Sequence, residues 1–315
     1  TEILCQGACV REAQEHQPVR IGELQRYATD WFFESGETFF ERGEPTGKRI
    51  AVVGGGPAGL SCAHRLAVLG HETVVFEVRE KLSGLNEYGI AAYKTVNDFA
   101  QREVDFILQI GGIETRTNQK LGQEVILDDL RKEYDAVFLS VGLGDVNLLG
   151  LEGEEPKGVY DAVETISELR QSVNLRELSV GRRIVVIGGG NTAIDISVQS
   201  KKLGAEDVTL TYRRGPEQMS ATWKEQEFAQ TNGVRVKHWV APKSLQSENG
   251  HVSGIEFECT ELNPEGKLIG TGELRYMEAD VVFKAIGQLL EDSVFSGSEI
   301  PAIEGGKIAV NSEFE

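Results

Sequence analysis

Cysteine is scarce in this sequence, and the few cysteines lack a spacing that would give them a shared structural role. The 315 residues include four, at Cys5, Cys9, Cys62 and Cys259, which are too scattered for a disulfide framework. No pair has the C-x-x-C spacing of a redox-active dithiol. The sequence therefore excludes two common uses of paired thiols.

Long apolar runs and excess positive charge are also missing. No run approaches the roughly 18 apolar residues of a membrane span, which argues against a membrane partner. Nothing at the N-terminus resembles a signal peptide, so we expect a cytoplasmic protein. With 32 basic and 50 acidic residues, the net charge of −18 argues against a nucleic-acid partner. The five histidines form no cluster with metal-ligand spacing.

Glycine, in contrast, is frequent and sits in clusters, one of which organises the chain. An apolar segment that starts at Arg49 runs into Gly54-x-Gly56-x-x-Gly59, and residues 58–69 have helical spacing before Gly70. Strand, glycine turn and helix predict a dinucleotide site, in which the first helical amides face the phosphates. About 20 residues further on, the next strand ends in an acid that can accept hydrogen bonds from a ribose. The residues predicted to bind are Gly54, Gly56, Pro57, Ala58, Gly59 and Glu77.

The same pattern returns downstream in Gly188-x-Gly190-x-x-Ala193, followed by a predicted helix over residues 192–203. Alanine in the third position is tolerated by the fingerprint. The next strand ends in Arg213 and Arg214, where an acid would otherwise stand. Basic residues there can accept the 2′-phosphate of NADPH, or they can form a solvated strand end, and both interpretations stay open.

Two further strands share one design. Residues 134–142 and 279–287 each read as a buried strand that ends in glycine beside a cofactor site, at Gly142 and Gly287. The Asn249-Gly250 pair predicts a hairpin turn. Residues 156–160 read as a linker, and helices are expected over 98–110, 162–170 and 221–230.

Two dinucleotide units in one chain suggest two cofactors held face to face, with hydride transfer from a nicotinamide to a flavin. The cofactors carry that chemistry and the protein supplies position and electrostatics, so we nominate no catalytic residue. A non-catalytic nucleotide-binding assembly module is the alternative from another class. Near the N-terminus, Cys5 and Cys9 are either iron–sulfur ligands or surface thiols.

Four stretches taken together resemble the glutamate synthase small subunit family, which includes the electron-input half of dihydropyrimidine dehydrogenase. They are Gly54–Gly59, the loop Gly84-Leu-Asn-Glu-Tyr-Gly-Ile-Ala-Ala-Tyr-Lys94, Gly188–Ala193 and Tyr212-Arg-Arg214. The loop is most similar to that of bacterial NAD-dependent dihydropyrimidine dehydrogenase flavoprotein subunits. The resemblance implies an α/β protein with two Rossmann-like domains of the FAD/NAD(P) type, the second inserted in the first.

The resemblance also implies domains, cofactors and a partner. Residues 1–47 would be a helical remnant of an iron–sulfur domain, 48–164 and 291–315 the FAD-binding domain, and 165–290 the NAD(P)-binding domain. Electrons would pass from NADH or NADPH to FAD and through [4Fe–4S] clusters to a catalytic partner subunit that reduces pyrimidines. The alternative partner is the large subunit of glutamate synthase.

Family positions extend the predicted site. The FAD site gains Gly84, Leu85, Lys94 and Gly142. The NAD(P) site comprises Gly188, Gly190, Asn191, Thr192, Ala193, Arg213, Arg214, Ala285, Ile286 and Gly287. Cys5, Cys9 and Gln25, the last in a Gly-Glu-Leu-Gln setting, would be iron–sulfur ligands if upstream cysteines are present.

Several positions depart from the family pattern. Ser83 replaces a glycine of the second loop, Lys94 stands where arginine is common, and Ser220 stands where mammalian, NADPH-dependent dihydropyrimidine dehydrogenase has arginine, which favours NADH. The upstream cysteines are missing, and the sequence stops at Glu315, before an Ala-Gly-Gly-Asp segment that contacts FAD in the family. We therefore expect a fragment trimmed at both ends, without its [4Fe–4S] clusters.

Overall fold

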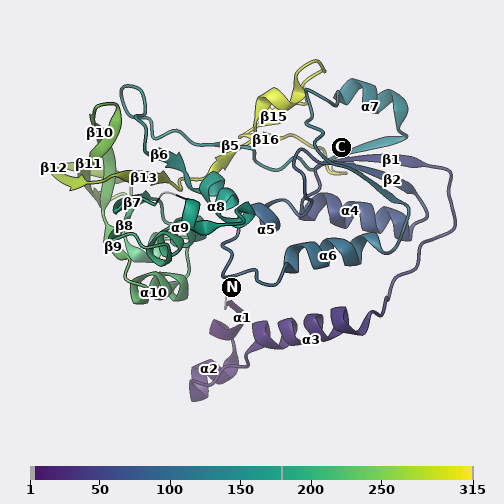
Figure 1. Cartoon of the computed structure of the whole chain (residues 1–315), viewed down its shortest axis with the longest axis horizontal. Coiled ribbons are helices and arrows are strands. Elements are labelled where there is room, and N and C mark those ends of the chain that lie inside the picture. The colour runs from purple at the N-terminus through teal and green to yellow at the C-terminus, as the bar shows by residue number, and fades with distance from the viewer. Residues whose placement is uncertain (1–3, 179, 314–315) are drawn as a thin grey trace. The chain divides into compact units, whose positions relative to one another are not determined.

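The structure is a computed structural model that describes residues 4–178 and 180–313 (Figure 1). Its contacts divide the chain into two units. Unit 1 contains the chain up to Asp30, Tyr88–Lys94 and Asn147–Gly287, and unit 2 contains Trp31–Glu87, Thr95–Val146 and the chain from Gln288 onward. The expected α/β class with two dinucleotide-binding folds is confirmed. The domain boundaries at residues 47, 164 and 290 stay a prediction.

Unit 2 is built on a parallel sheet with strand order β3-β2-β1-β4. Side chains alternate across β1 because strand neighbours point to opposite faces. Val52 packs with Leu60 and Val104 on the side of helices α4 and α6, while Val53 packs with Leu130 of α7 on the other side. The strands and helices are β1 (Arg49–Val53), α4 (Pro57–Val68), β2 (Glu72–Phe76), α5 (Leu85–Tyr88), α6 (Phe99–Leu108), β3 (Ile113–Arg116), α7 (Leu127–Glu133), β4 (Ala136–Leu139), β5 (Asp145–Val146), β14 (Gln288–Leu289), η3 (Asp292–Phe295), β15 (Ile303–Glu304) and β16 (Lys307–Ile308).

The expected burial of strand β4 is wrong. Its residues are half-buried or exposed, and the Phe138 side chain is 39% exposed. The reason is topological, since β4 lies at the end of the sheet and pairs with β1 alone among the described residues. Local apolar composition could not show which strand would be at the edge.

Unit 1 repeats the arrangement in a sheet of order β6-β13-β7-β8-β9, in which β13-β7-β8-β9 corresponds to β4-β1-β2-β3. The extra strand β6 covers the outer edge of β13, which is therefore buried as expected. Residues 156–160 are not a simple linker, because Val159 and Tyr160 begin β6 and pair with Val282 and Phe283. The elements are β6 (Val159–Asp161), α8 (Ala162–Gln171), η1 (Leu175–Glu177), β7 (Arg183–Ile187), α9 (Asn191–Lys202), β8 (Asp207–Tyr212), η2 (Pro216–Gln218), α10 (Trp223–Thr231), β9 (Arg235–His238) and β13 (Val281–Lys284).

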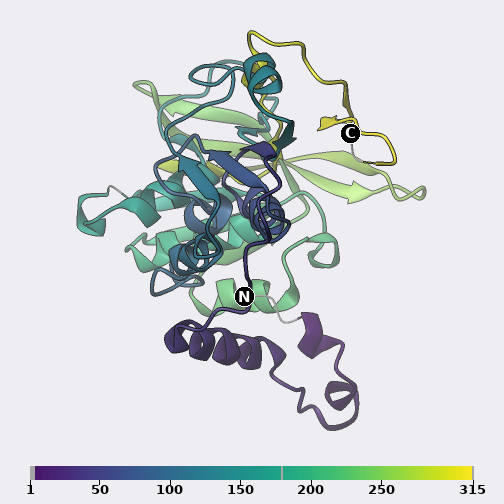
Figure 2. The same cartoon turned by 90° about the vertical axis from the view of Figure 1, so that its right-hand side faces the viewer.

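Two layers cover the sheet of unit 1. Ile184 and Val186 of β7 pack toward helices α8, α9 and α10, whereas Val185 and Ile187 pack toward a three-stranded antiparallel sheet. The long strands of that sheet are drawn in light green in Figure 2. That sheet has the order β10-β11-β12, with bounds Val240–Glu248, His251–Leu262 and Leu268–Glu278. The predicted hairpin at Asn249-Gly250 joins β10 to β11, with φ of 52° and 78° at the two residues.

The two sheets also begin alike. The Arg49 amide donates to Asp135 Oδ2 over 2.9 Å, and the Arg183 amide donates to Asp280 Oδ2 over the same 2.9 Å. In each case the acid immediately precedes a strand that pairs with the strand containing the arginine. This correspondence supports an internal duplication that the glycine patterns alone suggested.

The N-terminal part is helical, as expected, with α1 (Leu4–Gly7), α2 (Val10–Glu15) and α3 (Ile21–Ser35). No residue of α3 is buried, and Leu24, Tyr27 and Trp31 are all more than half exposed. Within residues 4–178 and 180–313, no helix is both long and apolar enough to cross a membrane.

The segment Tyr88–Lys94 is fixed to unit 1 by buried polar contacts. Lys94 Nζ lies 2.7 Å from Asp195 Oδ1 and 2.7 Å from Glu225 Oε2, and its side chain is only 9% exposed. The Tyr93 hydroxyl donates to Asp195 Oδ1 over 3.0 Å. Burial alone would lower the pKa of Lys94, but the two carboxylates more than offset it and raise that pKa above its usual value. Lys94 is therefore a buried cation between two buried acids.

We predict that Lys94→Met lowers the free energy of unfolding by about 3–5 kcal/mol, because it leaves two acids without their cation. Since the folded pKa is raised, the contribution of Lys94 is complete below its ordinary pKa of 10.5 and is lost as pH rises through the folded value. Urea unfolding at pH 8 and pH 11 measures both effects. Lys48→Met is the matched control, since its 2.6 Å pair with Asp135 is exposed and screened by water, so its loss of stability should be much the smaller of the two. Equal losses in the two variants would contradict the prediction.

Candidate nucleotide sites

Each glycine turn is closed by a backbone contact that leaves no space for a side chain. The Gly54 amide donates to the Phe76 carbonyl over 2.8 Å, and a Cβ atom on Gly54 would lie 2.2 Å from the Ser140 carbonyl oxygen. In unit 1 the Gly188 amide donates to Thr211 over 3.0 Å, and a Cβ there would lie 2.2 Å from the Ala285 oxygen. Only glycine fits either position.

The second glycine of each turn is less crowded than the first. A Cβ on Gly56 would meet nothing closer than 3.9 Å, and one on Gly190 would meet Ser220 Oγ at 3.3 Å. Both residues are helix N-caps and offer no side-chain oxygen to the first helical amides of α4 and α9. Such amides suit a phosphate, and space above the glycine lets it approach. This geometry fits a pyrophosphate at both turns.

The remaining fingerprint residues lie around these turns. A Cβ on Gly59 would lie 1.9 Å from the Gly54 oxygen, so this glycine allows close packing, whereas Ala193 is accommodated fully buried in unit 1. Pro57, Ala58 and Asn191 are exposed and Thr192 is half-buried, each in the first turn of its helix.

Glu77 has the position expected of a ribose acceptor. It follows β2, is 6% exposed, and accepts from the Gly55 amide at Oε2 over 2.7 Å and from the Arg79 amide at Oε1 over 2.9 Å. Each carboxylate oxygen retains lone-pair capacity for a ribose hydroxyl. The two amides thus orient the carboxylate, and no sequence motif pointed to them.

The second glycine loop joins the first turn directly. The Ser83 amide donates to the Gly55 carbonyl over 2.8 Å, and a Cβ on Gly84 would lie 2.9 Å from Gly56 Cα. Leu85 follows and is 49% exposed. Ser83 has φ of 88°, a conformation in which a side chain is strained, and glycine is the residue that suits it.

Two further residues were predicted for the FAD site, Lys94 and Gly142. Lys94 belongs to unit 1, where it pairs with Asp195 and Glu225, and a role with FAD stays a prediction. Gly142 is exposed, with φ of 69°, two residues after the strand end that contacts Gly54.

At the NAD(P) turn, the end of β13 follows the expected course. The Ala285 amide donates to the Ile187 carbonyl over 2.8 Å, which places Ala285 against Gly188. Asn147 Nδ2 donates to the Ile286 carbonyl over 3.2 Å, a contact that sequence reasoning missed because no motif includes Asn147. Gly287 is exposed and has φ of 97°.

Arg213 and Arg214 directly follow β8. Arg213 is exposed and Arg214 is half-buried. The Tyr212 ring packs beneath the turn, since a Cβ on Gly189 would lie 2.5 Å from it. The end of β8 is therefore next to the glycine turn, as a site for the adenosine ribose requires.

The predicted iron–sulfur ligands occupy the N-terminal helices. Cys5 is exposed on α1, Cys9 is half-buried before α2, and Gln25 is exposed on α3. The Val19 amide, with smaller help from Arg11, lowers the pKa of the Cys9 thiol. Two thiols do not complete the four ligands of a cluster, and the described part of the chain contains no group of three or more His, Cys, Asp or Glu side chains able to hold a metal.

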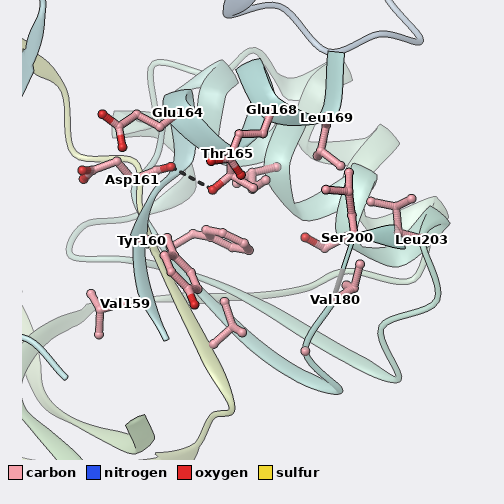
Figure 3. A pocket seen from close by; sticks show the side chains of 15 residues that line it. Val159, Tyr160, Asp161, Glu164, Thr165, Glu168, Leu169, Val180, Ser200 and Leu203 are labelled. Atoms are coloured by element: carbon pink, nitrogen blue, oxygen red, sulfur yellow. Dashed lines mark hydrogen bonds between the residues drawn. The ribbon is translucent and has the colours of Figure 1, made fainter. Parts of the chain in front are cut away.

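A cavity of about 360 Å³ lies apart from these sites (Figure 3). It is lined by Tyr160 of β6, Glu168 and Leu169 of α8, and Ser200 near the end of α9. Gly181, which precedes β7, also lines it. The cavity is thus at the amino ends of the strands, whereas the glycine turns follow the carboxyl ends.

The fold and the two glycine turns define a class of protein, one with paired dinucleotide-binding folds of the FAD/NAD(P) type. Residues 48–315 match the family described as pyridine nucleotide-disulphide oxidoreductase, and residues 1–37 match dihydropyrimidine dehydrogenase domain II, 4Fe-4S cluster. The chain belongs to the pyridine nucleotide-disulphide oxidoreductase family.

Curated relatives include the glutamate synthase [NADPH] small chain of Escherichia coli, 37% identical over 90% of this chain and 63% of its own length. The NAD-dependent dihydropyrimidine dehydrogenase subunit PreT of Salmonella typhimurium is 29% identical over 91% of this chain and 65% of its own length. The chain therefore spans less than two thirds of each. These results confirm the family resemblance inferred from the four motifs.

Among solved structures, Mycobacterium tuberculosis FprA in complex with NADPH superposes with a TM-score of 0.65 at 20% identity, covering 78% of this chain and 71% of FprA. Thioredoxin reductase from T. acidophilum gives 0.61 at 17% identity, covering 84% and 86%. Both similarities support the fold.

We predict that Gly54→Ala lowers the free energy of unfolding by more than about 3 kcal/mol, because the new methyl group meets a backbone carbonyl that cannot move away. Gly204→Ala is the matched control, since Gly204 has φ of 107° against 106° for Gly54 and nothing within 4 Å. The Gly204→Ala variant should be destabilised only by backbone strain, which costs about 1–2 kcal/mol. Urea unfolding of both variants measures the difference, and similar losses would show that sterics at the turn are unimportant.

We also predict that Ser83→Gly raises the free energy of unfolding by about 0.5–1 kcal/mol, because relief of the positive φ exceeds the entropy that glycine loses on folding. Asn97→Gly is the control, at an exposed residue with φ of 58°. Asparagine tolerates this region, so the control should change by less than about 0.5 kcal/mol. A destabilised Ser83→Gly variant would mean that the serine makes compensating contacts.

Proposed function

We propose that this chain oxidises NADH or NADPH with FAD and passes the electrons, through iron–sulfur clusters of the full-length protein, to a partner subunit that reduces a pyrimidine. The observation that carries the proposal is the pair of glycine turns, each closed by a strand-end carbonyl at its first glycine and less crowded at its second. When bound, FAD and NAD(P)H supply the hydride chemistry themselves.

The side chains around the turns then have binding roles. Glu77 is oriented to accept the ribose hydroxyls of FAD, and the first amides of α4 face its pyrophosphate. The first amides of α9 take the second pyrophosphate, and Ala285, Ile286 and Gly287 line the opposite side of that turn. Asn147 fixes the backbone of this lining through Ile286.

Two observations favour the pyrimidine branch. The 84–94 loop and the Gly-Glu-Leu-Gln25 stretch resemble that branch, and residues 1–37 match a dihydropyrimidine dehydrogenase domain. The alternative is electron delivery to a glutamate synthase large subunit, and the 37% identity to the E. coli small chain favours it. We place either activity in the cytoplasm.

The test uses the full-length protein with its co-purifying partner. We expect a flavin spectrum that bleaches on addition of NADH or NADPH, and uracil-dependent turnover when the partner is present. A colourless full-length protein would contradict the flavin assignment, while glutamine-dependent turnover would support the alternative partner.

A variant tests the role of Glu77 in the same preparation. Glu77→Gln should raise the Kd for FAD about ten-fold, because hydrogen bonds to a charged group contribute about 1.5–3 kcal/mol. Glu80→Gln removes an exposed carboxylate a few residues further on and should leave the Kd unchanged. FAD titration by fluorescence quenching measures the Kd of both variants. An unaltered affinity in Glu77→Gln would contradict a role of Glu77 in binding the ribose of FAD.

A further inference from the structure

The backbone that carries Arg213 and Arg214 is held from a different sheet. The Thr260 hydroxyl, on β11, donates to the Arg213 carbonyl over 2.8 Å. The Trp239 amide, between β9 and β10, donates to the Arg214 carbonyl over 3.3 Å. The Arg213 carbonyl is thus paired with a residue of the adjoining antiparallel sheet. The Arg214 carbonyl is paired with a residue of the junction that leads into that sheet.

The two donors are themselves joined. The Thr260 amide donates to the Trp239 carbonyl over 3.0 Å, and Thr260 is 7% exposed. Trp239 has φ of 61°, which is unfavourable for a large side chain and persists only where the surroundings impose it. Such strained residues cluster at binding sites. Thr260 and Trp239 therefore form a rigid clamp on the arginine backbone.

Gly215, the residue after the two arginines, packs closely against Trp239. A Cβ on Gly215 would lie 2.9 Å from Trp239 Cζ2, so the indole covers the Gly215 backbone. The Glu217 carboxylate lies 2.9 Å from the same point, but Glu217 is exposed, so solvent screens its charge.

The clamped segment also has buried polar atoms without partners. Within residues 4–178 and 180–313, Arg214 Nε and His238 Nε2 are buried and make no hydrogen bond. His238 precedes Trp239 and pairs in register with Tyr212. Buried donors are usually paired, so an unpaired guanidinium nitrogen at this position suggests an anionic ligand.

We propose that Thr260 and Trp239 are positioning residues that aim Arg213 and Arg214 at the 2′-phosphate of an adenosine ribose, so that the NAD(P) site selects NADPH over NADH. The inference rests on the proposed nucleotide function of the Gly188 turn. It reverses the expectation that Ser220 favours NADH, because two arginines carried on a held backbone can bind a dianion without a third cation.

The test is binding of 2′,5′-ADP and of 5′-AMP to the whole chain by calorimetry. The wild-type chain should bind 2′,5′-ADP at least about ten-fold more tightly, as expected for a new charge-assisted contact. Thr260→Val should reduce that ratio about five-fold, since it removes one hydrogen bond that orients Arg213, and leave the Kd for 5′-AMP within about two-fold. Thr260→Ser, which keeps the hydroxyl, should restore the ratio.

Thr271→Val is the matched control. The Thr271 hydroxyl donates to the Cys259 carbonyl over 3.2 Å in the same sheet but contacts neither arginine, so the ratio should stay at its wild-type value. Equal weakening of both ligands in Thr260→Val, or a wild-type ratio near one, would overturn the inference. Binding of neither ligand by the wild-type chain would instead contradict the nucleotide function itself.

Discussion

The contact on which both units depend is a carbonyl oxygen seated where a side chain would otherwise be. Ser140 supplies it to Gly54 and Ala285 supplies it to Gly188, each time from the strand next to the one that precedes the turn. The contact seats the end of the neighbouring strand directly against the turn. A side chain at Gly54 or Gly188 would force that strand end away from the start of the following helix, so the same close approach depends on glycine twice in the same chain.

Much of this could be predicted because the signals are local. The glycine fingerprints, the helical spacing after them and the Asn249-Gly250 turn gave element positions within about two residues of α4, α9 and the β10–β11 hairpin. Burial of β4 was predicted wrongly, and β6 was missed. Both errors concern which strand lies beside which, a property of distant segments that apolar composition does not record.

The candidate sites show the same difference between what local sequence signals reveal and what contacts between distant segments decide. Glu77 was identified from its spacing, but the amides of Gly55 and Arg79 that orient it are visible only in three dimensions. Arg213 and Arg214 were identified as basic residues at a strand end, whereas the partner of the Arg213 carbonyl comes from a strand more than 40 residues later. Motifs locate the groups that meet a ligand, and long-range hydrogen bonds decide how rigidly those groups are held.

The ion pairs of Lys94 have a consequence for dividing the chain. Asp195 and Glu225 belong to the long continuous segment Asn147–Gly287, yet their cation arrives on a heptapeptide from much earlier in the chain. A gene fragment covering only that segment would encode the whole second sheet and leave two carboxylates buried without a counter-ion. The segment Asn147–Gly287 is therefore not a self-sufficient unit, and recombination that moves it must carry residues 88–94 as well.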